Sequence, residues 1–210
     1  MRMRPKNESL AAEILQVAKT EFLEKGYRKA SLRNIAASVG VTTGAIYRYY
    51  ANKETLFDAL VAEPADTFYE WYRSFSESYA KRDREDQLQG LTNPSPDTGE
   101  TERAFAYIYR HYDAFKLIAC CAEGTKYERY IDRLIDVETR STGTLVRLMQ
   151  EAGKLDADVD ETMIHIIASS MFTAYFEIIA HDESVEVALR HLVKLCDFYK
   201  AGWLKLLGVA

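Results

Sequence analysis

The stretch LRNIAASVGVTTGAIYRYYANK, from Leu32 to Lys53, contains the most informative pattern of the chain. Its apolar residues recur at the spacing of two short helices joined by a tight turn at Gly40. Glycine suits that turn because a residue with a Cβ is strained at positive φ. Ala36 is small, so the second helix can cross close to it, and the angle between the helices is fixed by a small core of Ile35, Val39, Val41 and Ile46. This pattern predicts a helix-turn-helix.

Helical periodicity continues on the N-terminal side of this stretch. Apolar residues at steps of three and four predict a helix over residues 10–23, which Gly26 would end. Ser31 is suited to cap the first helix of the pair. Thr42 or Thr43 can cap the second, which is expected to include the tyrosines that follow.

Helices are also expected on the C-terminal side. A long helix should begin near Lys53 and be kinked rather than stopped at Pro64, because aromatic residues continue the helical period beyond the proline. The polar segment 81–100, which contains prolines and glycines, is predicted to be a mobile loop. Further helices are predicted over residues 101–121, 124–152, 158–181 and 184–207. No convincing run of alternating apolar residues is present, so the fold is predicted to be all-α.

Charge is distributed unevenly along the chain. The 210 residues carry a net charge of −5, but residues 1–53 hold ten basic and four acidic side chains, a local charge of +6. The remaining residues hold 17 basic and 28 acidic side chains, a charge of −11. A basic end on an acidic body indicates that only about the first 50 residues approach a polyanion, although accidental clustering would give the same numbers.

Composition argues against a membrane or secreted protein. Hydrophobic residues make up 48% and charged residues 28%, as in ordinary soluble globular proteins. No uninterrupted apolar stretch approaches the roughly 18 to 20 residues of a membrane span, and none follows the N-terminus as a signal peptide would. The three cysteines form no disulfide framework. A cytoplasmic location is therefore expected.

Neither a metal site nor a catalytic site is predicted. The four histidines lack the spacing of metal ligands. The neighbours Cys120 and Cys121 would point about 100° apart on a helix, which suits packing better than joint chelation. No nucleophile-elbow motif is present. The chain is therefore predicted not to be an enzyme and to need no cofactor.

Five short motifs occur at characteristic separations between Ile14 and Leu60. They are Gly26-Tyr27, Ile35-Ala36, Gly40-Val41, Ile46-Tyr47 and Asn52-Lys53-Glu54. Each alone carries no weight, but together this quarter of the chain resembles the DNA-binding domain of the TetR family of transcriptional regulators. The resemblance implies a helix-turn-helix DNA-binding domain at residues 1–53 and a helical effector-binding and dimerisation domain at residues 54–210.

The resemblance also implies roles for individual residues. Tyr47, Tyr49 and Lys53 would contact DNA phosphates, and the residues near base edges would be Arg33, Thr42, Thr43, Gly44 and Arg48. Tyrosine hydroxyls and a lysine can donate to phosphate oxygens, and such contacts fix register without reading sequence. An arginine can pair bidentately with guanine, and a glycine permits close approach to the DNA backbone. From the residues alone, the tyrosines could instead pack against the first helix, and Arg33 could be a solvated surface charge.

One helix-turn-helix reads about half an operator, so dimerisation is expected. The candidate surface is formed by the helices predicted over 158–181 and 184–207, which could also simply complete the core. Its expected members are Ile164, Ile167, Met171, Tyr175, Ile178, Val185, Leu189, Leu192, Leu195, Cys196 and Tyr199.

A ligand pocket is expected in the same larger domain, where regulators of this type hold their effector. A small-molecule pocket needs mostly apolar walls and a few convergent polar groups. The candidate lining residues are Tyr107, Arg110, His111, Phe115, Tyr127, His165, Phe172 and Phe176. For any one of them, a purely structural position in the core is an alternative.

The sequence therefore predicts a dimeric, sequence-specific DNA-binding regulator, most simply a repressor that a small-molecule effector releases from a palindromic double-stranded operator. Three alternatives remain open at this point. The chain could be a helical ligand-binding or protein-interaction module without DNA binding, a regulator without an effector, or an activator.

Overall fold

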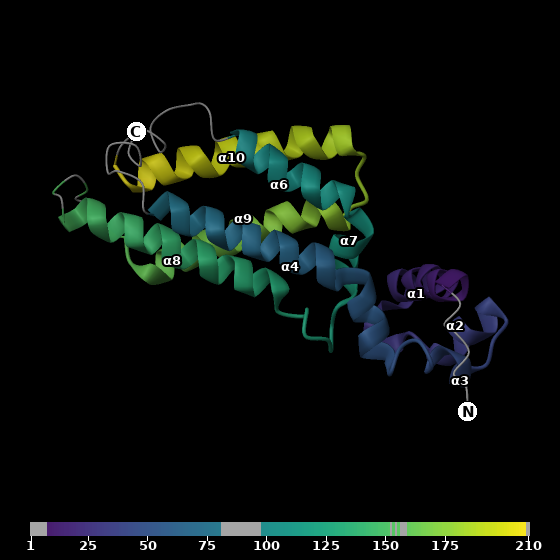
Figure 1. The fold of residues 1–210 in the computed structure, drawn as a ribbon. Coiled ribbons are helices and arrows are strands. Elements are labelled where there is room, and N and C mark those ends of the chain that lie inside the picture. The colour runs from purple at the N-terminus through teal and green to yellow at the C-terminus, as the bar shows by residue number, and fades with distance from the viewer. Residues whose placement is uncertain (1–7, 81–97, 152, 154, 156–158, 209–210) are drawn as a thin grey trace. The chain divides into compact units, whose positions relative to one another are not determined.

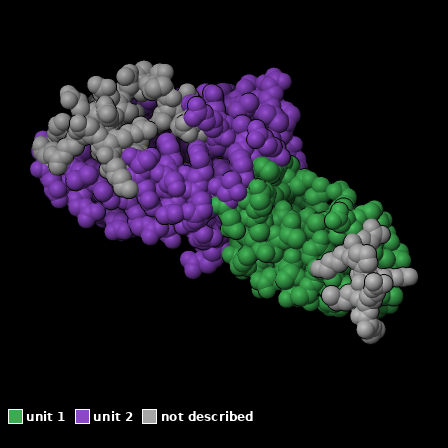
Figure 2. All heavy atoms as spheres, viewed as in Figure 1, with its two compact units in different colours: residues 1–66, 111–128 green, residues 67–110, 129–210 purple. Residues whose placement is uncertain are grey.

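The computed structural model describes residues 8–80, 98–151, 153, 155 and 159–208 (Figure 1). All regular structure in these ranges is helical, which confirms the all-α prediction. The chain divides into two compact units, coloured separately in Figure 2. Unit 1 comprises Met1–Asp66 and His111–Glu128, and unit 2 comprises Thr67–Arg110 and Arg129–Ala210. These units do not coincide with a boundary at residue 53, and the functional division drawn there stays a prediction.

Unit 1 is built around the predicted helix-turn-helix. It contains four complete helices and the first part of a fifth: α1 (Glu8–Lys29), α2 (Leu32–Val39), α3 (Thr43–Ile46), α7 (Tyr112–Cys121) and the start of α4 (Lys53–Ala80). The side chains of Ile14, Ala18 and Phe22 on α1 are fully buried, and α1 packs against both α2 and α7. Because α7 is contributed by a distant part of the sequence, the core of this unit is not made by the N-terminal residues alone.

The turns of unit 1 follow the predicted glycines. Gly26 interrupts α1 with a φ of 70°, and Gly40 ends α2 in the left-handed conformation with a φ of 73°. A Cβ would meet nothing within 4 Å at either position, so backbone conformation rather than crowding favours glycine there. Thr42 caps α3, its Oγ1 accepting the Ala45 N–H at 3.2 Å. Contrary to the prediction, helix α3 ends at Ile46 and does not include the tyrosines that follow. Residues 47–49 form turns instead.

Unit 2 consists of long helices that pack along one another. It contains the remainder of α4 with α6 (Thr98–Arg110), α8 (Tyr130–Glu151), α9 (Glu161–Ala180) and α10 (Val185–Leu206). Helix α9 packs against α8 and α10, and α10 also contacts α6. Helix α4 continues past Pro64, as predicted, although proline offers no N–H to the carbonyl four residues earlier. The kink expected at this position stays a prediction.

Several helix boundaries in this part of the chain differ from prediction. The single helix expected over 101–121 is two helices, α6 and α7, separated at His111, whose ψ of 35° is not helical. This break coincides with the passage of the chain from unit 2 to unit 1. The next helix begins at Tyr130 rather than residue 124, because Gly124 has a φ of 87° and turns occupy the residues before α8. The segment 81–97 of the predicted mobile loop lies outside the described residues, and its last residues, 98–100, belong to α6.

Helix α9 is the most apolar helix among those described. Its length and composition alone would allow it to cross a membrane. A core helix has the same composition, and α9 buries Ile164, Ala168, Phe172 and Phe176 within the chain. Through this buried stripe α9 packs within unit 2, while most of its other residues are exposed or half-buried.

The outward face of α9 differs from the one predicted for dimerisation. Ile164 and Ile178 are buried inside the unit, as is Leu192 on α10. The large apolar side chains that are exposed on these helices are Met163, Ile166, Val185, Val193 and Phe198. The predicted set was therefore wrong for the buried members, because on an apolar helix the periodicity alone does not tell which stripe faces the core.

Candidate nucleic-acid interface and ligand cavity

The candidate DNA-facing surface lies on α2, α3 and the turn after α3. Ile46 is fully buried and fixes α3 to the unit, while the neighbouring Tyr47 is 52% exposed. Arg33 on α2 and Arg48 after α3 are also exposed. The buried Ile46 thus leaves Tyr47 and Arg48 at the surface, and Arg33 adds a second exposed guanidinium group from α2, so that the basic segment can reach a polyanion.

The other predicted DNA contacts differ in exposure. Thr42 and Gly44 are exposed, whereas Thr43 and Tyr49 are half-buried. Gly44 lies in the helical region of α3, and a Cβ there would meet only the Thr42 Oγ1, at 3.8 Å. The local structure therefore does not require glycine at this position. That Gly44 permits close approach to the DNA backbone stays a prediction.

Lys53 is engaged within unit 1. Its Nζ donates to the carbonyl oxygens of Tyr27 at 2.7 Å, Arg28 at 3.2 Å and Ala30 at 3.1 Å, and it lies 4.5 Å from the centre of the Tyr27 ring. Burial lowers the pKa of this amine. All three protons of the ammonium have acceptors at the end of α1, so the predicted phosphate contact would require at least one of these bonds to be shared or broken.

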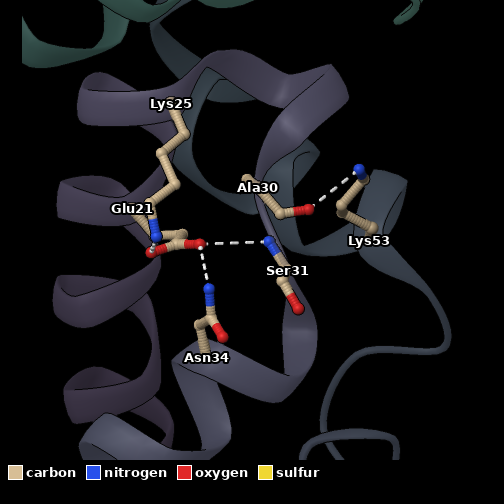
Figure 3. A network of polar contacts seen from close by, with 6 residues as sticks. All are labelled: Glu21, Lys25, Ala30, Ser31, Asn34 and Lys53. Carbon is tan, nitrogen blue, oxygen red and sulfur yellow. Dashed lines mark hydrogen bonds and ion pairs between the residues drawn. The ribbon is translucent and has the colours of Figure 1, made fainter.

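A buried carboxylate organises the start of the helix-turn-helix (Figure 3). Glu21 on α1 is 9% exposed and accepts hydrogen bonds from the Ser31 N–H at 3.2 Å, from Asn34 Nδ2 at 3.2 Å and from Lys25 Nζ at 2.8 Å. Burial opposes its charge, but the bonds from Lys25, Ser31 and Asn34 outweigh that effect and hold the pKa of Glu21 below its ordinary value. The carboxylate therefore anchors the N-terminus of α2 to α1.

Ser31 does not cap α2 with its side chain as predicted; instead, its backbone N–H donates to Glu21. Ser31 has the extended backbone of an N-cap, but its side chain makes no capping hydrogen bond. The sequence contained a signal for this arrangement, because Glu21 falls on the same helical face as Ile14 and Ala18. An acidic residue in an apolar stripe has to be paired if it is buried.

The candidate ligand cavity lies in unit 2 and has a volume of about 250 Å³. Its walls come from α4, α6, α8, α9 and α10 and are mainly aromatic and aliphatic. The polar groups that reach it are those of Thr101, Glu138, Tyr72, Tyr175 and Trp71. Apolar walls with a few polar groups are the usual composition of a small-molecule site.

Two hydroxyl groups of the cavity have defined partners. Tyr72 donates its hydroxyl proton to the Glu138 carboxylate, and the Tyr175 oxygen lies 3.5 Å from the Cys196 sulfur. Burial, followed by the nearby Glu138 charge, raises the pKa of Tyr72 well above its ordinary value. Burial likewise raises the pKa of Tyr175, with Cys196 contributing. Both phenols are therefore neutral donors over the physiological pH range.

The eight predicted effector-binding residues do not gather in this cavity. Phe172 and Phe176 line it. Tyr107 lines a neighbouring cavity of unit 2, His165 borders a shallow polar depression, and Arg110 is exposed at the end of α6.

The other three belong to unit 1. Phe115 is fully buried in that unit, His111 precedes α7, and the Tyr127 hydroxyl donates to Asp58. The sequence did not reveal that residues 111–128 leave unit 2, so a lining drawn across the 105–130 segment combined residues of two units. A ligand contact for any of the eight stays a prediction.

The surroundings of the candidate sites contain no arrangement typical of metal binding. Among the described residues, no three His, Cys, Asp or Glu side chains gather in a way that could hold a metal ion. Cys120 is exposed and Cys121 is buried, and burial raises the pKa of the Cys121 thiol.

Comparison with known proteins agrees with the helix-turn-helix. The family model for bacterial regulatory proteins of the tetR family matches residues 14–60. The HTH-type transcriptional repressor KstR2 of Mycobacterium tuberculosis is 32% identical over 102 residues, which make up 49% of this chain and 50% of the relative. The repressor AcnR of Corynebacterium diphtheriae is 43% identical over 53 residues, 25% of this chain and 28% of the relative. The chain thus spans half or less of the length of these curated relatives.

Solved structures extend the likeness of fold beyond that domain. The probable transcriptional regulatory protein RHA5900 matches with a TM-score of 0.55 at 18% identity, over 95% of this chain and 98% of that one. A TetR-like transcriptional regulator from Rhodococcus sp. RHA1 matches with a TM-score of 0.52 at 16% identity, over 91% and 96% of the two chains. At these identities the likeness concerns the fold alone. Residues 14–60 thus match the DNA-binding domain of bacterial regulatory proteins of the tetR family, and the fold of the described residues is similar to that of these solved regulators.

Proposed function

We propose that this chain is a dimeric, sequence-specific DNA-binding repressor of the cytoplasm and that a small-molecule effector releases it from its operator. The observation that carries the proposal is the helix-turn-helix surface, where Arg33, Tyr47 and Arg48 are exposed on a segment with a net charge of +6. The family match of residues 14–60 and the repressor relatives support the same reading.

In this proposal the second helix of the pair enters a major groove. The arginines read base edges and the tyrosine hydroxyls hold phosphates, so that specificity and register come from different side chains. Lys53 assists only if DNA draws its ammonium away from the carbonyls of α1. Two copies related by a two-fold axis would present their recognition helices about 34–36 Å apart, matching a palindromic operator.

Support for dimerisation comes from α9 and α10. The large apolar side chains of Met163, Ile166, Val193 and Phe198 are exposed on these two helices, and a second copy packed there would remove them from water. Two helices from each copy would form a four-helix arrangement.

The effector is proposed to occupy the cavity of unit 2. An effector can release DNA only if it binds the released conformation more tightly than the operator-bound one, by several kcal/mol for a nearly complete shift. Because the sign of regulation depends on where the operator lies, repression is inferred from the repressor relatives.

The decisive experiment is an unbiased selection of bound DNA sequences, followed by a gel shift with the selected site. We expect a palindromic site whose affinity falls steeply with salt, since each neutralised phosphate releases counterions. A scrambled duplex of equal length is the matched control. No selected sequence, or an affinity that stays the same between low and moderate salt, would refute the proposal.

A further inference from the structure

The described lining of the cavity in unit 2 carries negative charge but no positive charge. Among the described residues that line it, Glu138 is acidic and none is Lys, Arg or His. The rest of its wall is aromatic and aliphatic, with Trp71, Phe172 and Phe176 among the largest side chains. A ligand that enters this cavity therefore meets one carboxylate and the electron-rich faces of several rings.

The partners of Glu138 leave its charge uncompensated. Its carboxylate accepts the Tyr72 hydroxyl proton through one oxygen, and Thr142 Oγ1 lies 3.2 Å from the other. Both donors are neutral hydroxyl groups. Within the described part of the chain, no Lys or Arg forms an ion pair with Glu138, whereas the exposed carboxylates of Glu70 and Glu77 on α4 both pair with Arg73.

The second phenol of the cavity, Tyr175, also cannot compensate the charge of Glu138. Tyr175 lies near enough to Glu138 for the carboxylate to contribute to the raised pKa of the phenol, after the larger effects of burial and Cys196. Neither Tyr72 nor Tyr175 can supply a positive charge. A carboxylate in such surroundings is stabilised strongly by an opposite charge and weakly by further neutral donors.

We propose that the effector of this regulator is a small hydrophobic amine whose cationic group is received by Glu138 and whose apolar body packs among Trp71, Phe172 and Phe176. This inference rests on the proposed function, because it names the ligand class of the proposed effector cavity. A carboxylate or phosphate ligand would instead bring a second negative charge beside Glu138, and its binding is disfavoured. The volume of about 250 Å³ suits a molecule with one ring and a short chain.

The test is a matched series of three probes that differ only in their terminal group. Phenylpentylamine, phenylpentanol and phenylpentanoate are titrated into the full-length protein by calorimetry at neutral pH. We expect the amine to bind at least about tenfold more tightly than the alcohol, because it brings an opposite charge to a half-buried carboxylate whose hydrogen-bond donors are neutral hydroxyl groups. Phenylpentanoate is expected to bind most weakly of the three.

Two variants connect the preference to Glu138. Glu138→Gln keeps the shape and the hydrogen-bond acceptor but removes the charge, so the affinity for the amine should fall about tenfold while that for the alcohol changes by about twofold or less. Asp136→Asn removes one charge from an exposed position of the same helix outside the cavity, and all three affinities should remain as in the wild type. In a Trp203→Phe background, a change in Trp71 fluorescence reports that the amine occupies the cavity.

The inference is overturned if no probe binds, if the alcohol or the carboxylate binds as tightly as the amine, or if Glu138→Gln retains the preference. The comparison of probes on the wild type decides the matter even if a variant folds poorly. Operator binding is assayed separately by gel shift. If the protein selects DNA but shows no preference for the amine, only the proposed ligand class is refuted. If it prefers the amine but binds no DNA, the proposed regulator function is refuted.

Discussion

At the scale of single residues, the exposed arginines of the helix-turn-helix carry the specificity of the proposed regulator. For Arg33→Ala and Arg48→Ala we expect an intact fold and a loss of discrimination of about 1–3 kcal/mol against the wrong base pair at the contacted position. Competition binding with single-base variants of the selected operator measures this. Arg33→Lys is the matched control for charge, since it keeps phosphate attraction but lacks the bidentate fork. Unchanged sequence preference in both alanine variants would remove these residues from the reading surface.

Glu21 makes the helix-turn-helix sensitive to acid. Its folded-state pKa lies below the ordinary value of 4.5, so its contribution to stability is complete above that value and is lost as pH falls through the lower pKa of the folded state. We expect Glu21→Gln to lower the free energy of unfolding at neutral pH by about 1–2 kcal/mol. Denaturant unfolding at several pH values should then show a smaller loss of stability in acid for the variant. Glu13→Gln, at an exposed position of the same helix, is the control. Parallel pH profiles for wild type and Glu21→Gln would contradict the role.

Glu21 shows which single-residue features could not be predicted from the sequence. Arg33, Tyr47 and Arg48, which the family resemblance assigned to DNA contacts, are exposed as such contacts require. The network around Glu21 was missed, because a pairing with Ser31 and Asn34 depends on how α1 crosses α2. Periodicity identifies the face of a helix but not the neighbour that meets it.

At the scale of elements, Lys53 joins two helix ends. A lysine in the first turn of α4 is unfavourable for the dipole of that helix, yet its ammonium satisfies three carbonyls at the end of α1, where a positive charge is favourable. The polar contact thus fixes the start of α4 to the end of α1. Sequence spacing alone could not distinguish this role from a phosphate contact.

Lys53→Met tests both roles at once. Losing the three carbonyl contacts should lower stability by about 1–2 kcal/mol, measured by thermal or denaturant unfolding. If Lys53 also contacts a phosphate, the slope of log affinity against log salt should decrease by about one unit. Lys29→Met removes an exposed lysine near the same helix end and serves as the comparison. A Lys53→Met protein as stable as the wild type would show that the carbonyl contacts do not stabilise the fold.

Helix positions were predictable from the sequence to different degrees. The strong markers were correct: Gly26 and Gly40 adopt positive φ, Thr42 caps α3, and α4 continues past Pro64. The break at His111 carries neither a proline nor a glycine, and it occurs where the chain passes between compact units. Such a break is imposed by tertiary packing rather than by local preference.

At the scale of the whole molecule, α9 and α10 are the proposed dimer surface. Phe198, which is 69% exposed, is the most exposed of their large apolar side chains. We expect Phe198→Glu combined with Ile166→Glu to shift the protein from dimer to monomer, because a like charge would replace apolar contact on both copies. Sedimentation velocity measures the change, and operator affinity should fall with it. Ser74→Glu and Ser78→Glu together add the same charge on the exposed face of α4 and should leave the dimer intact. A double mutant that remains dimeric would place the interface elsewhere.

The ligand cavity was the least predictable part of the molecule. Phe172 and Phe176 were among the candidates, but the α4 aromatic side chains and Glu138 were not. Together with Phe172 and Phe176, these lining residues come from three helices that are distant in the sequence, α4, α8 and α9, and their convergence depends on packing angles that no local pattern encodes.

The contribution of residues 111–128 to unit 1 has a consequence for protein engineering. A fragment that ends at Asp66 would leave the side of α1 that meets α7 open to water, so we expect it to aggregate when it is expressed alone. A chimaera that transfers unit 1 to another regulator would need to carry both of its segments, residues 1–66 and 111–128. We expect a chain in which a linker joins Asp66 to His111 to be more soluble than the fragment ending at Asp66, because it would carry both segments of unit 1.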